Sequence, residues 1–83
     1  LTPYVGLSFT RGAAGIRVVS VAPHSPAEEC GIRKGDIIES INGKPVQKKA
    51  HVMAALAGVH GAGVLFGAAG AFWRGVIFCF MRP

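Results

Sequence analysis

The dipeptide Asn42-Gly43 is the feature that most restricts how this chain folds. Asn-Gly is the strongest short-range signal for a β-hairpin, because both residues adopt the positive φ angles that a two-residue turn needs. Residues 36–41 before it alternate as a strand does, and residues 44–46 after it make a short return. We therefore expect an antiparallel hairpin over residues 36–46.

A short helix is predicted ahead of this hairpin. Ser25 is a typical N-cap, Pro26 suits the first helical position, and Glu28 follows the serine by three residues, which makes a capping box. Glu28 and Glu29 are also favoured by the positive end of the helix dipole. Gly31 suits the left-handed residue that ends a helix, so we expect little more than one turn.

The N-terminal part of the chain has strand patterns. Val5, Leu7 and Phe9 alternate with small or polar residues, as in a half-buried strand. Residues 12–15, Gly-Ala-Ala-Gly, predict a turn. Residues 16–21 are β-branched and mostly apolar, which indicates a central strand.

The second half of the chain is apolar and poor in charge. Residues 48–59 are rich in alanine and carry larger apolar side chains at steps of three and four, which predicts an amphipathic helix. Beyond it, we expect a short strand at 64–66, a Gly-Ala-Ala-Gly turn at 67–70 and a long strand at 72–81.

One alternative for this region is a membrane-spanning helix. Residues 50–73 form a run of 24 residues without a charged side chain, which is long enough to span a bilayer. The run contains five glycines, eight alanines and two histidines, so its tendency to insert is weak. A soluble domain is the favoured interpretation.

The charge of the chain limits its partners. The formal net charge is +5, but the basic residues are scattered and the aromatic residues lie among apolar ones. Nucleic-acid binding requires a basic stripe, often with interleaved aromatics, so this partner class is disfavoured. The positive potential favours an anionic ligand.

The residues that could carry chemistry do not form a catalytic or metal-binding set. Asp36 is the single aspartate, and the three histidines have no nearby cysteine or paired carboxylate, so we expect no metal, no cofactor and no catalysis by this segment alone. Cys30 and Cys79 follow no metal or redox spacing. Reduced, partly buried thiols are expected, and one disulfide remains an open alternative.

Several segments together resemble a PDZ domain. They are Gly15-Ile16-Arg17-Val18-Val19-Ser20-Val21, Ser25-Pro26-Ala27, Gly31-Ile32-Arg33-Lys34-Gly35-Asp36-Ile37-Ile38 and Ile41-Asn42-Gly43-Lys44-Pro45-Val46. They cover about a third of the chain, in order and with family-like spacing. The resemblance implies an α+β fold: a small, partly open β-barrel or sandwich of five to six strands capped by two helices.

The strand order resembles that of the permuted PDZ domains in proteases of the high-temperature-requirement (HtrA) and tail-specific types. Only residues 1–3 precede the expected ligand loop, and the C-terminal strand could take the place of the missing first strand. A sequence cut short at its N-terminus would look the same, so both explanations stay open. We expect residues 1–83 to be one PDZ-like domain excised from a larger protein.

The resemblance also implies a function, which is recognition of the free C-terminus of another protein by β-strand addition. The expected carboxylate loop is Tyr4, Val5, Gly6 and Leu7. The expected peptide groove is Ser8, Phe9, Lys49, Val52, Met53 and Leu56, with an apolar pocket for the last ligand residue.

Position 49 departs from the family pattern. Many PDZ domains have a histidine there that accepts a Ser or Thr hydroxyl from the third-from-last ligand residue, whereas this chain has Lys49. The lysine could favour an acidic ligand residue, or it could be an ordinary solvated side chain. His51 is expected to lie off the groove. The alternative function is weak self-association, or a structural adaptor role, through the apolar hairpin Val64–Met81.

Overall fold

The computed structural model describes residues 5–57, 63–70 and 73–80. They form an antiparallel sheet of six strands and two helices. The strands are β1 (Leu7–Arg11), β2 (Ile16–Val21), β3 (Ile37–Ile41), β4 (Lys44–Pro45), β5 (Gly63–Ala69) and β6 (Arg74–Phe80), and the helices are α1 (Pro26–Glu29) and α2 (Lys49–Leu56). The expected α+β class, strand number and helix number are confirmed.

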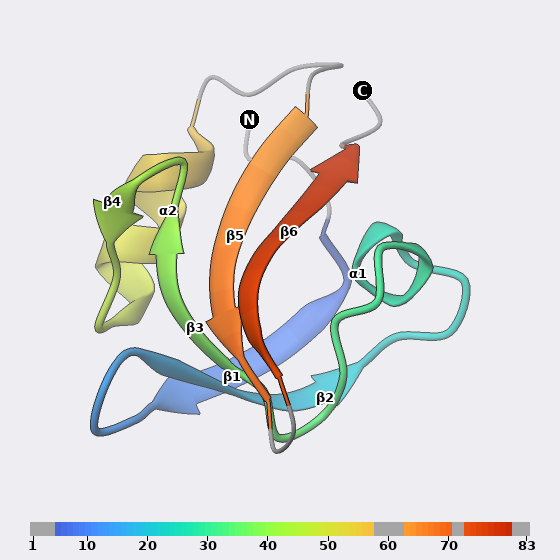
Figure 1. The fold of residues 1–83 in the computed structure, drawn as a ribbon, viewed down its shortest axis with the longest axis horizontal. Helices are drawn as coiled ribbons and strands as arrows, with labels where there is room; N and C mark the ends of the chain where they lie inside the picture. The colour runs from blue at the N-terminus through green and yellow to red at the C-terminus, as the bar shows by residue number, and fades with distance from the viewer. Residues whose placement is uncertain (1–4, 58–62, 71–72, 81–83) are drawn as a thin grey trace.

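Within the described part of the chain, the sheet is open at both ends. Its order is β1-β2-β3-β5-β6, and β4 pairs with β3 beside this path. In Figure 1, strands β5 and β6 cross over β1 and β2, with α2 and α1 on opposite sides of them. The strongly coiled sheet therefore encloses a core without closing into a barrel.

The Asn-Gly hairpin is confirmed. Asn42 and Gly43 have φ angles of 51° and 80°, the positive values of a type I′ turn, and β3 pairs with β4 across them. Asn42 also joins the turn to β5: its N–H donates to the Leu65 carbonyl at 2.7 Å, and its Oδ1 accepts from the Leu65 N–H at 2.9 Å.

The capped helix α1 is confirmed as well. The Glu28 N–H donates to the Ser25 hydroxyl oxygen at 3.2 Å. The Glu28 carboxylate accepts from the His24 N–H at 2.9 Å, one residue before the position that a capping box normally uses. Gly31 ends the segment with a φ of 96°.

Helix α2 ends at Leu56, earlier than the predicted boundary at residue 59, which lies outside the described residues. Its buried side chains are Val52 and Leu56. Among the described residues, none of the helices has the length and hydropathy to cross a membrane. The membrane interpretation of residues 50–73 is wrong, because Gly63–Ala69 is a strand of the sheet.

The predicted Gly-Ala-Ala-Gly turn at 67–70 is also wrong. Strand β5 continues through these small residues to Ala69, and the Gly70 N–H donates to the Trp73 carbonyl at 2.8 Å beyond it. Gly67 lies opposite Ser40 of β3, and a Cβ at Gly67 would overlap the Ser40 hydroxyl. The small residues therefore permit close strand pairing here, which local sequence rules do not distinguish from a turn.

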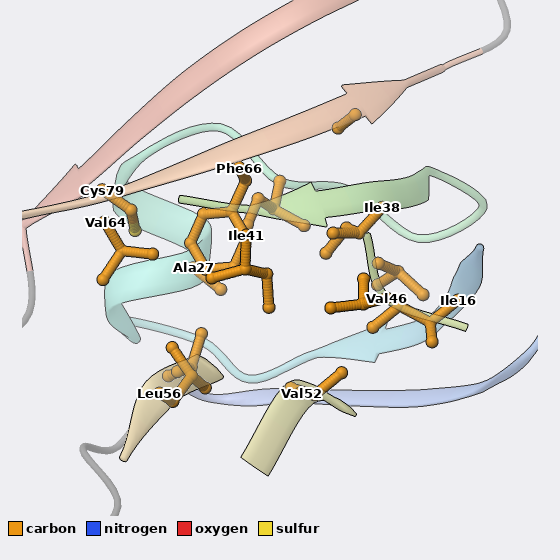
Figure 2. Close-up of a cluster of buried hydrophobic side chains, with 14 residues drawn as sticks. Ile16, Ala27, Ile38, Ile41, Val46, Val52, Leu56, Val64, Phe66 and Cys79 are labelled. Atoms are coloured by element: carbon orange, nitrogen blue, oxygen red, sulfur yellow. The ribbon is translucent and has the colours of Figure 1, made fainter. Parts of the chain in front are cut away.

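The core lies inside the coiled sheet. Figure 2 shows side chains from β2, β3 and β5 meeting those of α2. The largest fully buried side chains are Phe66, Ile16, Ile38, Ile41, Val18, Val46 and Val64.

The two cysteines are joined. Cys30 and Cys79 form a disulfide with their Cα atoms 5.2 Å apart, although they are 49 positions apart in the sequence. The expectation of reduced thiols is therefore wrong, and the alternative that the sequence left open holds. Pairing of β6 with β5 brings Cys79 beside α1, where Cys30 follows the helix.

Candidate functional site

A cavity of 740 Å³ lies between β1 and α2. Its walls include Leu7 and Phe9 of β1 and Met53 of α2, while buried side chains such as Ile38 and Phe66 line its inner side. Val52 and Leu56 of α2 also line the cavity, and Figure 2 shows both of them in the buried hydrophobic cluster. The site is an apolar groove beside the first strand of the sheet.

Among the residues that the structure describes, no strand pairs with the outer side of β1, so this side of the groove is an open sheet edge. The Ala22 N–H donates to the Gly6 carbonyl at 2.7 Å, and Leu7 and Ser8 then pair with Val21 and Ser20. The Gly6 carbonyl faces the β2 side, and because backbone groups alternate in direction along an antiparallel strand, those of Ser8 also face β2 and those of Leu7 face away from it. The N–H and C=O of Leu7 are therefore directed to the open edge.

The loop before β1 has an unusual backbone shape. Gly6 has a φ of 87°, in the left-handed region that favours glycine. The Val5 carbonyl accepts from the Ala27 N–H at 3.0 Å, so the carbonyls of Val5 and Gly6 are both held by the segment around α1. No described residue accepts a hydrogen bond from the N–H of Val5 or Gly6. Successive free N–H groups of this kind form a concave site for an anion.

The predicted site residues are largely brought together. The cavity is lined by Val5, Gly6, Leu7, Ser8, Phe9, Val52, Met53 and Leu56. Tyr4 lies outside the described residues. Lys49, at the start of α2, is exposed and is not among the lining residues. His51 is exposed, and its Nδ1 accepts from the Gln47 N–H at 3.1 Å.

Sequence reasoning did not include the β2 side of the cavity. The lining also contains Ser20, Val21, Ala22 and Pro23, together with Ile16, Ile38, Ile41 and Phe66. No local motif marks these positions, because they reach the groove through strand register. The lining residues include no charged side chain, so an anion in this groove would be held by backbone N–H groups.

A metal centre is not apparent in the described ranges. Within residues 5–57, 63–70 and 73–80, no three His, Cys, Asp or Glu side chains are grouped so that they could hold a metal ion.

Comparison with known proteins agrees with this geometry. Residues 17–66, more than half of the chain, match the family model described as PDZ domain. The chain is 44% identical over 48 residues to the serine protease HTRA1 of Xenopus laevis, covering 58% of this chain and 10% of that protein. It is 38% identical over 58 residues to the magnetosome formation protease MamE of Magnetospirillum gryphiswaldense, covering 69% of this chain and 8% of that protein. The chain thus spans about a tenth of the length of these relatives.

Solved structures share the fold. The HtrA3 PDZ domain bound to a phage-derived ligand, FGRWV, superposes with a TM-score of 0.84 at 22% identity, covering 95% of this chain and 84% of that one. The photosystem II D1 C-terminal processing protease gives a TM-score of 0.80 at 24% identity, covering 96% of this chain and 23% of that one.

The open edge beside an apolar groove, on this fold, defines a peptide-binding module. The chain belongs to the PDZ domain family, and its relatives make it a PDZ domain of the HtrA type. The isolated domain is a binding module and not an enzyme.

Proposed function

We propose that the chain binds the free C-terminus of a partner polypeptide, which joins the open edge of β1 as an added strand. The observation that carries the proposal is the arrangement of Val5, Gly6 and Leu7. The N–H groups of Val5 and Gly6, from which no described residue accepts a hydrogen bond, lead directly into Leu7, whose backbone groups face the open edge. Main-chain hydrogen bonds then supply affinity, and side-chain pockets supply specificity.

The loop formed by Tyr4, Val5, Gly6 and Leu7 would hold the terminal carboxylate. A carboxylate accepts several N–H hydrogen bonds at once, and such charge-assisted bonds are short and strong. The net charge of +5 adds a favourable long-range potential for an anionic chain end. The backbone shape supports this role: Gly6 has a positive φ, and the Val5 and Gly6 carbonyls accept hydrogen bonds from residues 27 and 22, while no described residue accepts from the N–H of Val5 or Gly6.

The last ligand side chain would be apolar and would enter the cavity between β1 and α2. Val5, Leu7, Phe9 and Leu56 line this space. The ligand of the HtrA3 PDZ domain, FGRWV, ends in valine and is consistent with this preference. The remaining groove positions would be Ser8, Val52 and Met53. The exposed Lys49 would contact the ligand only at the end of the groove.

We also propose that residues 1–83 serve as a regulatory or substrate-recruiting domain of a larger protein. The curated relatives are proteases of which this segment matches about a tenth. Recruitment of a substrate by its chain end would suit such a context.

The test is a binding titration of the peptide FGRWV, fluorescently labelled at its N-terminus, against the folded domain. An amidated copy of the peptide is the matched control, since it keeps every side chain and removes only the terminal charge. We expect the free acid to bind at least about tenfold more tightly, which corresponds to about 1.4 kcal/mol. Equal binding of the two peptides would contradict the carboxylate loop. If neither peptide binds, the domain is screened against a library of peptides with free C-termini. If no peptide of that library binds, the proposal is overturned.

A further inference from the structure

The sheet has a second open edge, at β6. The strand order ends there, so among the described residues no strand pairs with the outer side of β6. Strand β6 pairs with β5 over its whole length without a bulge, whereas β1 has an irregularity between Ser8 and Phe9. Proteins usually protect such an edge with a bulge, a proline or a lysine. Strand β6 has none of these and carries a single charged residue, Arg74, at its start.

The backbone groups that face this edge follow from the pairing with β5. The Gly70 N–H donates to the Trp73 carbonyl, and Ala69 lies opposite Arg74 in the next position. Alternation along the strand then directs every second residue towards β5 and the others outwards. The residues with outward N–H and C=O groups are Arg74, Val76, Phe78 and Phe80.

Three of these residues also have large exposed apolar side chains. The exposed fractions are 67% for Val76, 61% for Phe78 and 60% for Phe80. Leu65 of β5, 46% exposed, lies opposite Phe78 and extends the same surface. The four side chains expose on the order of 400 Å² of apolar area, which is comparable to the largest, often functional, patch of a typical monomer.

We propose that β6 pairs with β6 of a second copy of this chain, antiparallel about a two-fold axis at Ile77. In this register the outward residues of the two strands form the hydrogen-bonded pairs. Val76 lies opposite Phe78 of the partner subunit, which is a favourable pair of a β-branched and an aromatic side chain. Arg74 lies opposite Phe80 of the partner subunit, where a cation–π contact is available. The strand is thus complementary to itself.

The charges permit this pairing. The positive charge of Arg74 is compensated by Glu39, because the Arg74 Nη2 lies 2.9 Å from the Glu39 Oε2. The two copies of Arg74 would lie at opposite ends of the paired strands, about 20 Å apart, which exceeds the screening length of about 8 Å in physiological salt. The edge of β1 lies at the other end of the sheet and stays open, so each copy keeps its peptide groove.

The size of the contact sets its expected strength. Pairing at an edge covers only part of each outward side chain, so the interface falls below about 1,200 Å² in total, in the range of weak, transient complexes. We therefore expect a dissociation constant on the order of 10 to 500 μM.

Sedimentation of the folded chain, from about 10 μM to 1 mM, tests this proposal. Phe78→Lys places a charge on the open edge. Val76→Pro removes the N–H that faces outward, and it removes no hydrogen bond between β6 and β5. Leu65→Lys is the matched control, because it puts the same charge on the same surface one strand away from the edge. We expect the wild type and Leu65→Lys to dimerise, and both β6 variants to remain monomeric with an unchanged circular dichroism spectrum.

Other outcomes would overturn the proposal. A wild type that stays monomeric at the highest concentration excludes the dimer. Equal loss of dimer in Leu65→Lys indicates packing of the apolar faces instead of edge pairing. Amide hydrogen exchange gives an independent measurement: the N–H groups of Val76 and Phe78 should exchange at least about fivefold more slowly at high than at low concentration. An unchanged exchange rate at these two positions would contradict the register. None of these measurements depends on a peptide ligand.

Discussion

The backbone N–H of Ala27 lies 3.0 Å from the carbonyl oxygen of Val5, so the first turn of α1 holds the loop that precedes β1. A second bond, from the Ala22 N–H to the Gly6 carbonyl, holds the next residue. These bonds fix the carbonyls of Val5 and Gly6 within the protein itself. If the loop binds a chain end as proposed, it is shaped before the peptide arrives, which lowers the entropy cost of binding.

Gly6→Ala should weaken peptide binding by at least about tenfold, because a residue with a Cβ is disfavoured at a φ of 87° and the loop will relax. Gly43→Ala is the matched control. Gly43 has a similar φ of 80° and open space around the position of a Cβ, and it lies in the hairpin away from the groove. Both variants should lose about 1–2 kcal/mol of unfolding free energy. Equal peptide affinity of the two variants would contradict the loop assignment.

Met53→Glu should abolish binding of apolar-ended peptides while the domain stays folded. Met53 lines the cavity yet is 41% exposed, so a charge there remains solvated in the free protein and is desolvated beside the apolar ligand in the complex. Lys49→Ala, four residues earlier on α2, is the control and should change affinity by about twofold or less, since exposed charges contribute little. A larger loss in Lys49→Ala, confined to peptides with an acidic third-from-last residue, would show that this lysine selects the ligand.

Reduction of the Cys30–Cys79 disulfide should lower the free energy of unfolding by about 2–4 kcal/mol, because the bridge closes a long loop and restricts the unfolded chain. Urea unfolding with and without dithiothreitol measures this difference. The double variant Cys30→Ser/Cys79→Ser should match the reduced wild type within about 1 kcal/mol and should not respond to dithiothreitol. A wild type that is equally stable in both conditions would contradict the prediction.

Gly15→Ala should destabilise the domain by about 1–3 kcal/mol through overpacking. A Cβ at Gly15 would overlap the backbone carbonyl of Ile38, which cannot rotate away because β2 and β3 are paired there. Gly12→Ala in the same turn is the control, since its Cβ would come no closer than 3.2 Å to the Gly15 carbonyl oxygen. Thermal unfolding of the two variants should separate them by several degrees. Equal melting temperatures would count against the close approach of β2 and β3.

Much of the fold is determined locally and can be predicted from the sequence alone. Asn42-Gly43 specifies its turn because both residues tolerate positive φ, and Ser25 specifies the start of α1 because its hydroxyl accepts a backbone N–H three residues on. Each of these signals acts within a few residues. They are sufficient for the hairpin and for α1, whereas the class of fold was expected from the PDZ resemblance, as was a groove between β1 and α2, where the cavity lies.

Only the tertiary structure decided the features that depend on distant residues. Residues 67–69 continue β5 because they pair with β3 on one side and β6 on the other, and Gly67 fits where a Cβ would overlap the Ser40 hydroxyl. The pairing of Cys30 with Cys79 depended on where β6 meets α1. Which strands keep an open edge is likewise a property of the whole sheet, because an edge exists only where no other strand supplies hydrogen-bond partners.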